Sequence, residues 1–101
     1  MQLKSGLRLQ STACDTQIIV VRAPANADVD LRCGGHEVVP VGGAGGNAVA
    51  AEHSAGTLMG KRYADDELGL EVLCTKPGAG SLSIGETPLA EKGAKPLPSS
   101  D

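Results

Sequence analysis

The stretch Gln17-Ile18-Ile19-Val20-Val21-Arg22 is the strongest structural signal in this sequence. Its β-branched side chains favour an extended strand, because they pack well on a pleated surface and are stiff in a helix. Runs of weaker strand character lie before and after it, separated by the Gly, Pro, Asn and Asp residues that are typical of turns. These runs are 6–13, 29–33, 37–41, 57–63, 70–74 and 81–84. The pattern predicts a small all-β domain in which 70–74 and 81–84 form the arms of a hairpin.

The length of 101 residues corresponds to one domain. We expect a β-rich domain over residues 1–85, with a flexible Gly- and Ala-rich insertion at 42–56. One helical turn is the alternative to an irregular loop within that insertion. Residues 86–101 include Pro96 and Pro98 and are predicted to form an extended tail.

Tyr63 is the single aromatic residue, and the chain has no Phe and no Trp. Aromatic rings supply much of the buried area of small cores, so this core must be built from aliphatic side chains. Such a domain should be marginally stable alone, and a metal ion or another chain would supplement its core. We therefore expect a homodimer or a stable complex with another protein. Residues 86–98 should lie at or near that contact, where Leu97 could dock in a groove.

The charge of the chain argues against two classes of partner. A formal net charge of -3 and a pI of about 5.3, with scattered Lys and Arg, do not favour nucleic acid or an anionic membrane. No apolar run approaches the roughly 20 residues that cross a bilayer. Residues 1–6 lack the long apolar stretch of a secretory signal. We expect a cytoplasmic protein, in which the three cysteines stay reduced.

Cys14, Cys33 and Cys74 each adjoin a strand-like run. Cys33 and Cys74 close such runs before tight turns, and Cys33 and His36 have the two-residue spacing of metal-binding knuckles. The sequence therefore predicts a metal site formed by Cys14, Cys33, His36 and Cys74, whose side chains should converge within a few ångströms. Zinc is favoured over iron, because three thiolates and one imidazole suit a closed structural site.

A simpler interpretation exists for each of these residues and for the other polar motifs. A reduced cysteine is more often a small buried apolar residue than a ligand. His53 is expected to be exposed, and the acidic cluster 65–67 is expected to be a solvated turn. The glycines of 42–46 lack the Lys-Ser/Thr pair that follows a phosphate-binding loop. Ser54 beside His53 does not provide the geometry of a catalytic pair.

Residues 11–41 resemble desulforedoxin and the N-terminal domain of desulfoferrodoxin. The resemblance is carried by Ser11-Thr12-Ala13-Cys14, Ile18-Ile19-Val20-Val21, Leu31-Arg32-Cys33-Gly34-Gly35 and Val38-Val39. That family has a Cys-x-x-Cys knuckle, a valine-rich strand and a Leu-x-Cys-Cys-Gly segment. Its four thiolates hold iron, or zinc in its place, in a small β-rich fold that dimerises. The resemblance implies that Cys14 and Cys33 match two of those ligands, whereas Ser11 and Gly34 stand where the other two would be.

These observations predict a rubredoxin- or zinc-ribbon-like domain that binds zinc or iron and acts as an accessory or interaction module. Three alternatives stay open. An electron-transfer protein would bind iron and be coloured. A metal-free subunit of a larger enzyme would keep its cysteines in a core shared with the partner. A thiol-dependent enzyme would have one reactive cysteine of low pKa, and Cys33 with His36 is a conceivable pair for that chemistry.

Overall fold

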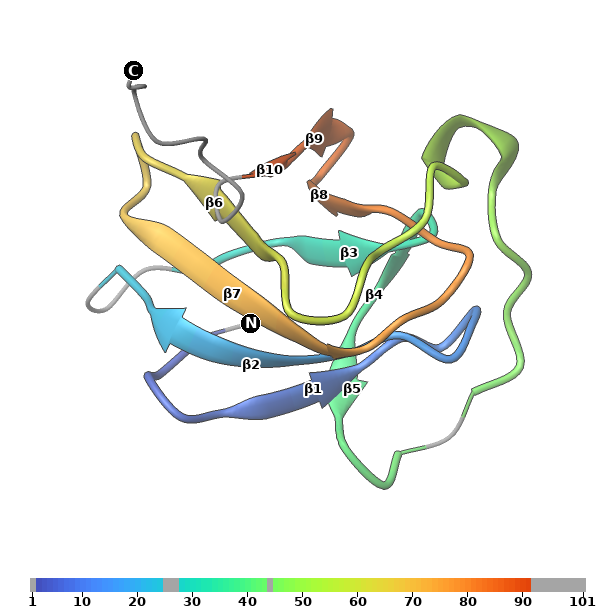
Figure 1. The fold of residues 1–101 in the computed structure, drawn as a ribbon, viewed down its shortest axis with the longest axis horizontal. Coiled ribbons are helices and arrows are strands. Elements are labelled where there is room, and N and C mark those ends of the chain that lie inside the picture. Colours follow the sequence, from blue (N-terminus) through green and yellow to red (C-terminus); the bar gives the residue numbers. More distant parts are fainter. Residues whose placement is uncertain (1, 25–27, 44, 92–101) are drawn as a thin grey trace, which may run out of the picture.

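The computed structural model describes residues 2–24, 28–43 and 45–91 and confirms the all-β fold. The strands are β1 Arg8–Gln10, β2 Gln17–Arg22, β3 Leu31–Cys33, β4 His36–Glu37, β5 Val39–Pro40, β6 Arg62–Asp65, β7 Leu70–Lys76, β8 Leu82–Ile84, β9 Thr87–Pro88 and β10 Ala90–Glu91. They form two antiparallel sheets (Figure 1). The larger sheet has the strand order β10-β6-β7-β2-β1-β5, and the smaller one has the order β4-β3-β8-β9.

One aliphatic core is shared by the two sheets. In β2, Ile18 and Val20 are buried while Val21 is exposed, which is the alternation that a half-buried strand requires. Val20 lies opposite Val72 of β7, and Leu31 belongs to β3 of the smaller sheet. All three side chains are fully buried. The buried cluster consists of Leu3, Leu9, Ile18, Val20, Val29, Leu31, Cys33, Val38, Tyr63, Leu70, Val72, Cys74, Leu82 and Leu89. The core is thus built almost entirely without aromatic rings.

Residues 70–74 and 81–84 do not form the predicted hairpin. β7 pairs with β2 and β6, whereas β8 pairs with β3 and β9 in the other sheet. A hairpin would place both runs in one sheet, but here their apolar side chains cover the core from two sheets. β7 also continues to Lys76, two residues beyond Cys74. The chain then crosses from the larger sheet to the smaller one over residues 77–81.

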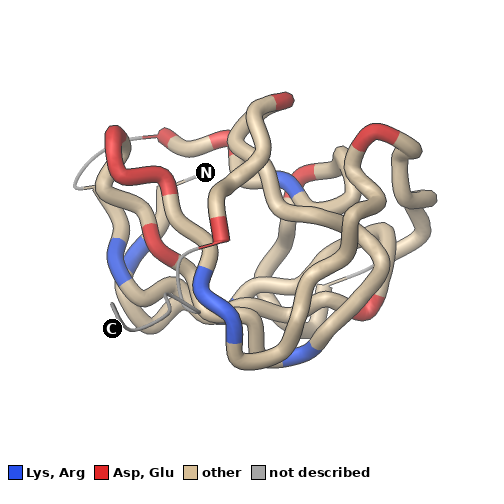
Figure 2. Tube along the Cα trace, turned by 45° about the horizontal axis from the view of Figure 1, so that its top comes forward, with Lys and Arg blue, Asp and Glu red and all other residues tan. Residues whose placement is uncertain are grey.

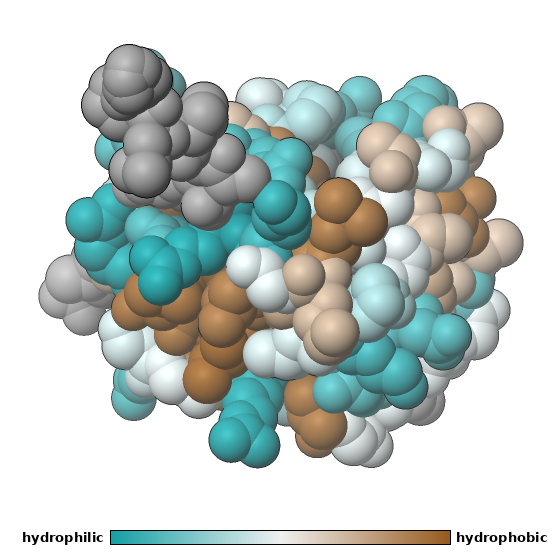
Figure 3. All heavy atoms as spheres, in the orientation of Figure 1, coloured by the Kyte–Doolittle hydropathy of each residue, from teal (hydrophilic) through white to brown (hydrophobic). Residues whose placement is uncertain are grey.

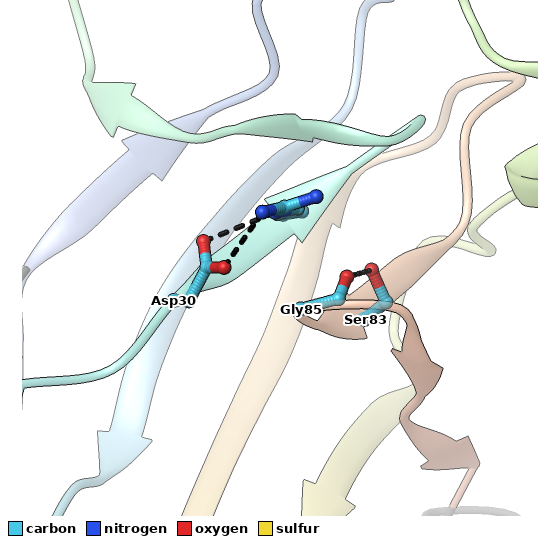
Figure 4. A network of polar contacts seen from close by, with 4 residues as sticks. Asp30, Ser83 and Gly85 are labelled. Carbon is cyan, nitrogen blue, oxygen red and sulfur yellow. Dashed lines mark hydrogen bonds and ion pairs between the residues drawn. The ribbon is translucent and has the colours of Figure 1, made fainter.

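Short-range polar contacts fix the strands of the smaller sheet (Figure 4). The Arg32 guanidinium donates two hydrogen bonds to the Asp30 carboxylate, at 3.1 and 2.8 Å, and these lower the pKa of Asp30. The buried Ser83 hydroxyl donates to the Gly85 carbonyl oxygen at 3.0 Å. Each of these contacts is local to one strand, and the two strand ends are joined by the sheet ladder and by the Gly85 N–H, which donates to the Asp30 carbonyl oxygen at 2.8 Å.

The predicted insertion and tail both contribute regular structure. Ala51–His53, inside the Gly- and Ala-rich segment, forms a 3-10 helix, the helical turn that was one of the two alternatives. Strands β9 and β10 lie within the first residues of the predicted tail. Residues 92–101, which include Pro96, Leu97 and Pro98, lie outside the described residues.

The charged and apolar side chains of the surface are distributed differently. Lys and Arg lie at several points along the described trace, in part next to one another (Figure 2). Apolar side chains gather over β2 and β7 on one face (Figure 3), where Val21 is 41% exposed and Ile19 and Leu73 are half-buried. Among the described residues, no helix is long and apolar enough to cross a membrane. The expected homodimer or protein complex stays a prediction.

Substitutions of two adjacent valines test which face of β2 packs against the core. We expect Val20→Ala to lower the free energy of unfolding by about 2 kcal/mol, because it removes buried methyl groups and leaves a cavity. Val21→Ala should change it by less than about 0.5 kcal/mol, because this side chain is largely in water. Urea denaturation of the two variants measures both values. Equal losses would contradict the assignment of the core face.

Candidate functional site

Three turns from distant parts of the chain meet at the sulfur of Cys14. The first is the turn 11–16 that carries Cys14, and the second is the β3–β4 turn at Gly34-Gly35. The third is the crossing segment 77–81. The Gly80 N–H donates to Cys14 Sγ at 3.3 Å, and the Gly34 N–H donates to the Ser81 carbonyl oxygen at 2.9 Å. Backbone, rather than bulky side chains, therefore surrounds much of this thiol.

Gly80 is required by this close approach. A Cβ atom at this position would lie 2.8 Å from the Gly34 nitrogen and 3.2 Å from Cys14 Sγ. The first separation is shorter than real Cβ contacts, and the atom it meets is backbone that cannot rotate away. Gly34 has a φ of 67°, a left-handed conformation that glycine adopts without steric cost. The sequence Cys33-Gly34-Gly35-His36 is thus a tight turn, as its glycines predict.

Cys14 and Cys33 form a close thiol pair. Their Sγ atoms are 4.0 Å apart. Cys33 ends β3 and has no exposed surface, whereas Cys14 is half-buried in its turn. The pair therefore consists of one thiol that solvent can reach and one that lies behind it in the core.

The hydroxyl of Ser11 accepts hydrogen bonds from the main chain of the turn that carries Cys14. Its Oγ accepts hydrogen bonds from the backbone N–H groups of Ala13, at 3.0 Å, and Cys14, at 3.2 Å. Two backbone N–H groups that point at one atom stabilise a negative charge there, such as that of a metal-bound cysteine thiolate. Here the atom is a buried hydroxyl oxygen. The Ser11 side chain therefore holds the turn 11–14 together, and the resemblance to desulforedoxin stays a prediction.

A chain of buried hydroxyl groups leads away from Cys14. Cys14 Sγ is 3.2 Å from Thr16 Oγ1, Thr16 Oγ1 is 2.5 Å from Thr57 Oγ1, and Thr57 donates to the Gly80 carbonyl oxygen at 3.1 Å. Both threonines are at most 2% exposed. When Cys14 is neutral, its thiol donates to Thr16, the Thr16 hydroxyl donates to Thr57, and the Thr57 hydroxyl donates to the Gly80 carbonyl oxygen. Each hydroxyl has only one proton to donate. For Thr16 to donate to the Cys14 thiolate, the direction of these hydrogen bonds therefore has to reverse.

The two thiols of the pair differ in acidity. Burial raises the pKa of Cys14, but hydrogen bonds from Ser11, Thr16 and the Gly80 N–H outweigh it and lower this pKa to about 7. Burial raises the pKa of Cys33 to about 12, and the neighbouring charge of Cys14 adds to the rise. At neutral pH, about half of Cys14 is therefore the thiolate, which is the nucleophilic form, while Cys33 keeps its proton.

Cys74 is buried in β7 beside this pair. Its thiol donates to the Lys76 carbonyl oxygen at 3.2 Å. Burial raises the pKa of Cys74, and the nearby Cys14 adds to the rise. In its strand, Cys74 is a packed core residue, which is the simpler interpretation of a reduced cysteine.

His36 and His53 are anchors for the segment 45–53 that covers the turns. His36 lies opposite Cys33 in the β3–β4 pair, but its Nε2 is 2.9 Å from the Ala48 carbonyl oxygen. The Ala50 N–H donates to the Gly34 carbonyl oxygen at 2.9 Å. His53, which was expected to be exposed, is half-buried, because its main chain is bonded to Ala50 and Ser81. Both imidazoles thus lie in the packing of this segment.

The four predicted metal ligands are brought together only in part. Cys14 and Cys33 are adjacent, Cys74 lies in the neighbouring strand, and His36 contacts the main chain of Ala48. Within residues 2–24, 28–43 and 45–91, no group of three or more His, Cys, Asp or Glu side chains is arranged to hold an ion. Two thiols and the hydroxyl of Ser11 fall short of the closed four-ligand shell of structural zinc. The four-ligand site stays a prediction.

No protein-family model, curated protein or solved structure matches this chain. The chemistry available to the site therefore has to be inferred from its own residues.

Thr16, Thr57 and Gly80 are the site residues that the sequence analysis did not identify. Thr16 lies two residues after Cys14, which was a usable signal, because a threonine so close can reach a thiol. Thr57 and Gly80 come from segments that only the tertiary fold brings to Cys14. The crossing of the chain between the sheets places both of them there.

The hydroxyl chain can be tested by titration of Cys14. We expect the rate of alkylation by iodoacetamide to rise with pH around a midpoint of about 7 in the wild type. Thr16→Val should move that midpoint upward by about one pH unit, because the thiolate loses one donor. Thr75→Val, which removes an exposed hydroxyl of β7, is the matched control and should leave the midpoint unchanged. Equal midpoints for all three proteins would contradict a role for Thr16.

Proposed function

We propose that this protein is a small thiol–disulfide exchange domain in which Cys14 is the attacking thiol and Cys33 the resolving thiol. The observation that carries the proposal is the 4.0 Å separation between the sulfur of half-buried Cys14 and that of fully buried Cys33. This arrangement suits sequential exchange, because a substrate reaches only the outer sulfur and the inner one attacks next. The proposal assigns the nucleophile to Cys14 rather than to Cys33 with His36.

The first step transfers one substrate sulfur to Cys14. The Cys14 thiolate attacks one sulfur of a substrate disulfide, and the substrate S–S bond breaks as the new bond to Cys14 Sγ forms. The second substrate sulfur leaves as a thiolate and takes a proton from water. The product of this step is a mixed disulfide between Cys14 and half of the substrate.

The second step closes the disulfide within the protein. The Cys33 thiol loses its proton to water and attacks Cys14 Sγ, and the bond from Cys14 to the substrate sulfur breaks. The remaining substrate half leaves as a thiolate and is protonated. The two thiols of the protein are oxidised to one disulfide, and the substrate disulfide is reduced to two thiols.

The acidity difference between the thiols favours this order. Burial keeps Cys33 protonated, and the thiolate of Cys14 strengthens that effect. Once Cys14 is in the mixed disulfide it carries no charge, so the repulsion disappears and Cys33 ionises more readily. Hydrogen bonds from Ser11 and Thr16 also favour the Cys33 anion. Formation of the disulfide shortens the separation of the two sulfurs from 4.0 Å to roughly 2.05 Å.

A second candidate function is the metal-binding accessory module predicted from the sequence. The observation in its favour is again the distance between Cys14 and Cys33. Two thiolates bound to one tetrahedral zinc ion, with bonds of about 2.3 Å, are about 3.8 Å apart, close to the 4.0 Å observed. Zinc, or iron in its place, would then need further donors from outside this pair. A protein partner or a second copy of the chain would be the source in an interaction module.

Trapping of the mixed disulfide tests the exchange mechanism. We expect reduced wild-type protein mixed with hydroxyethyl disulfide to end with a Cys14–Cys33 disulfide and two fewer hydrogen atoms in its mass. Cys33→Ser should stop at a stable adduct on Cys14, because the resolving thiol is gone. Cys74→Ser is the control and should behave like the wild type. Intact-mass and peptide mass spectrometry distinguish these products, and an adduct on Cys14 that never resolves in the wild type would contradict the proposal.

Replacement of Ser11 distinguishes the two candidate functions. We expect Ser11→Cys to raise the affinity for zinc by about tenfold or more, because a third thiolate joins the pair and is a far better zinc ligand than a hydroxyl. The wild type, expressed without a tag, should contain less than one zinc or iron per chain by elemental analysis. A full equivalent of metal in the wild type, with Cys14 and Cys33 protected from alkylation, would favour the metal-binding module over exchange.

A further inference from the structure

A polar cleft opens beside Cys14. It has a volume of about 350 Å³ and lies between the turn 10–17, residues 45–47 and Lys76 at the end of β7. This volume is at the small end of the roughly 300–1,000 Å³ range of sites for small molecules. Cys14 itself lines the cleft, whereas Cys33 does not. A molecule in the cleft would thus contact the outer thiol of the pair.

Two uncharged polar side chains, Gln10 and Asn47, hold the cleft wall in place. The Gln10 side chain donates to the Gly43 carbonyl oxygen at 2.7 Å and accepts from the Gly42 N–H at 3.2 Å. The Asn47 side chain donates to Thr12 Oγ1 at 2.8 Å, and the Asn47 N–H donates to the Thr12 carbonyl oxygen at 2.9 Å. These bonds fix Gly42, Gly43 and Asn47 against residues 10–12, so this part of the wall is set before any ligand binds.

Two charged residues of opposite sign line the cleft. They are Asp15, next to Cys14 in sequence, and Lys76. Both are exposed, and neither forms an ion pair with another residue in the described part of the chain. A ligand that carries a cation and an anion would pair with both, whereas a ligand of one charge would pair with one and be repelled by the other.

We propose that the cleft binds small disulfides whose halves carry both a carboxylate and an ammonium group, as in cystine. The assignment rests on the thiol–disulfide exchange proposed above and names its class of substrate. The ligand carboxylate pairs with Lys76, its ammonium pairs with Asp15, and its sulfur faces Cys14. The two charges thereby orient the substrate disulfide as well as bind it. A protein disulfide is not the favoured substrate, because the thiol is reached through a cleft of small-molecule size.

The test compares four disulfides that differ in charge. Reduced full-length protein is mixed in a stopped-flow instrument with cystine, cystamine, dithiodipropionate or hydroxyethyl disulfide. These are zwitterionic, cationic, anionic and uncharged at neutral pH. Each rate constant is divided by that of the same disulfide with 2-mercaptoethanol, which removes differences in intrinsic reactivity. The rate with iodoacetamide corrects every variant for its fraction of thiolate.

We expect the corrected rate for cystine to exceed that for hydroxyethyl disulfide by about fivefold, the scale of two solvent-exposed charge contacts. Lys76→Gln should slow cystine and dithiodipropionate, and Asp15→Asn should slow cystine and cystamine. Neither change should affect hydroxyethyl disulfide. Lys4→Gln, outside the cleft, is the charge-matched control and should have no effect on the selectivity.

Equal corrected rates for all four disulfides, or selectivity that survives both cleft variants, would overturn the assigned substrate class. The exchange function would still stand if hydroxyethyl disulfide yields the Cys14–Cys33 disulfide. Failure of every disulfide to yield it would overturn both proposals.

Discussion

The site depends on the direct packing of backbone against the sulfur of Cys14. Gly80 approaches this sulfur from the crossing segment and Gly34 lies against Gly80, so no side chain separates the three turns. The thiol gains an N–H donor that a bulkier residue would displace. Because that donor belongs to the main chain, it is held in place by the whole fold and does not have to be ordered when Cys14 ionises.

The route of the chain between the two sheets creates the asymmetry of the thiol pair. Cys33 is the last residue of β3 and lies in the shared core, where burial disfavours its thiolate form. Cys14 precedes β2 on a turn at the edge of the core, where hydroxyl and amide donors favour its anion. Two cysteines in contact thus acquire opposite acid–base properties from their positions in the fold. In the exchange that we propose, this difference lets Cys14 attack first and Cys33 second.

The sequence predicts part of this arrangement well. The β-branched run 17–22 and the apolar runs that end at Cys33 and Cys74 are strands, because their side-chain pattern matches a half-buried sheet. The glycine turn after Cys33 also follows from local chemistry. The pairing of 70–74 with 81–84 was wrong, because a short loop between two apolar runs does not reveal which sheet each run joins. Cys14 and Cys33, both predicted as metal ligands, are in contact in the fold, whereas the approach of Thr57 and Gly80 required the tertiary structure. The desulforedoxin resemblance stays a prediction.

An NMR titration of protein labelled with 13C at the cysteine Cβ atoms tests the central claim most directly. Our account predicts that the Cβ signal of Cys14 titrates with a midpoint of about 7, and that the Gly80 amide proton shifts with it. Addition of hydroxyethyl disulfide should then move the Cβ signals of Cys14 and Cys33 together into the disulfide range and leave that of Cys74 in place. Titration of Cys14 near its ordinary pKa of 9.0, or a disulfide that involves Cys74, would contradict the account.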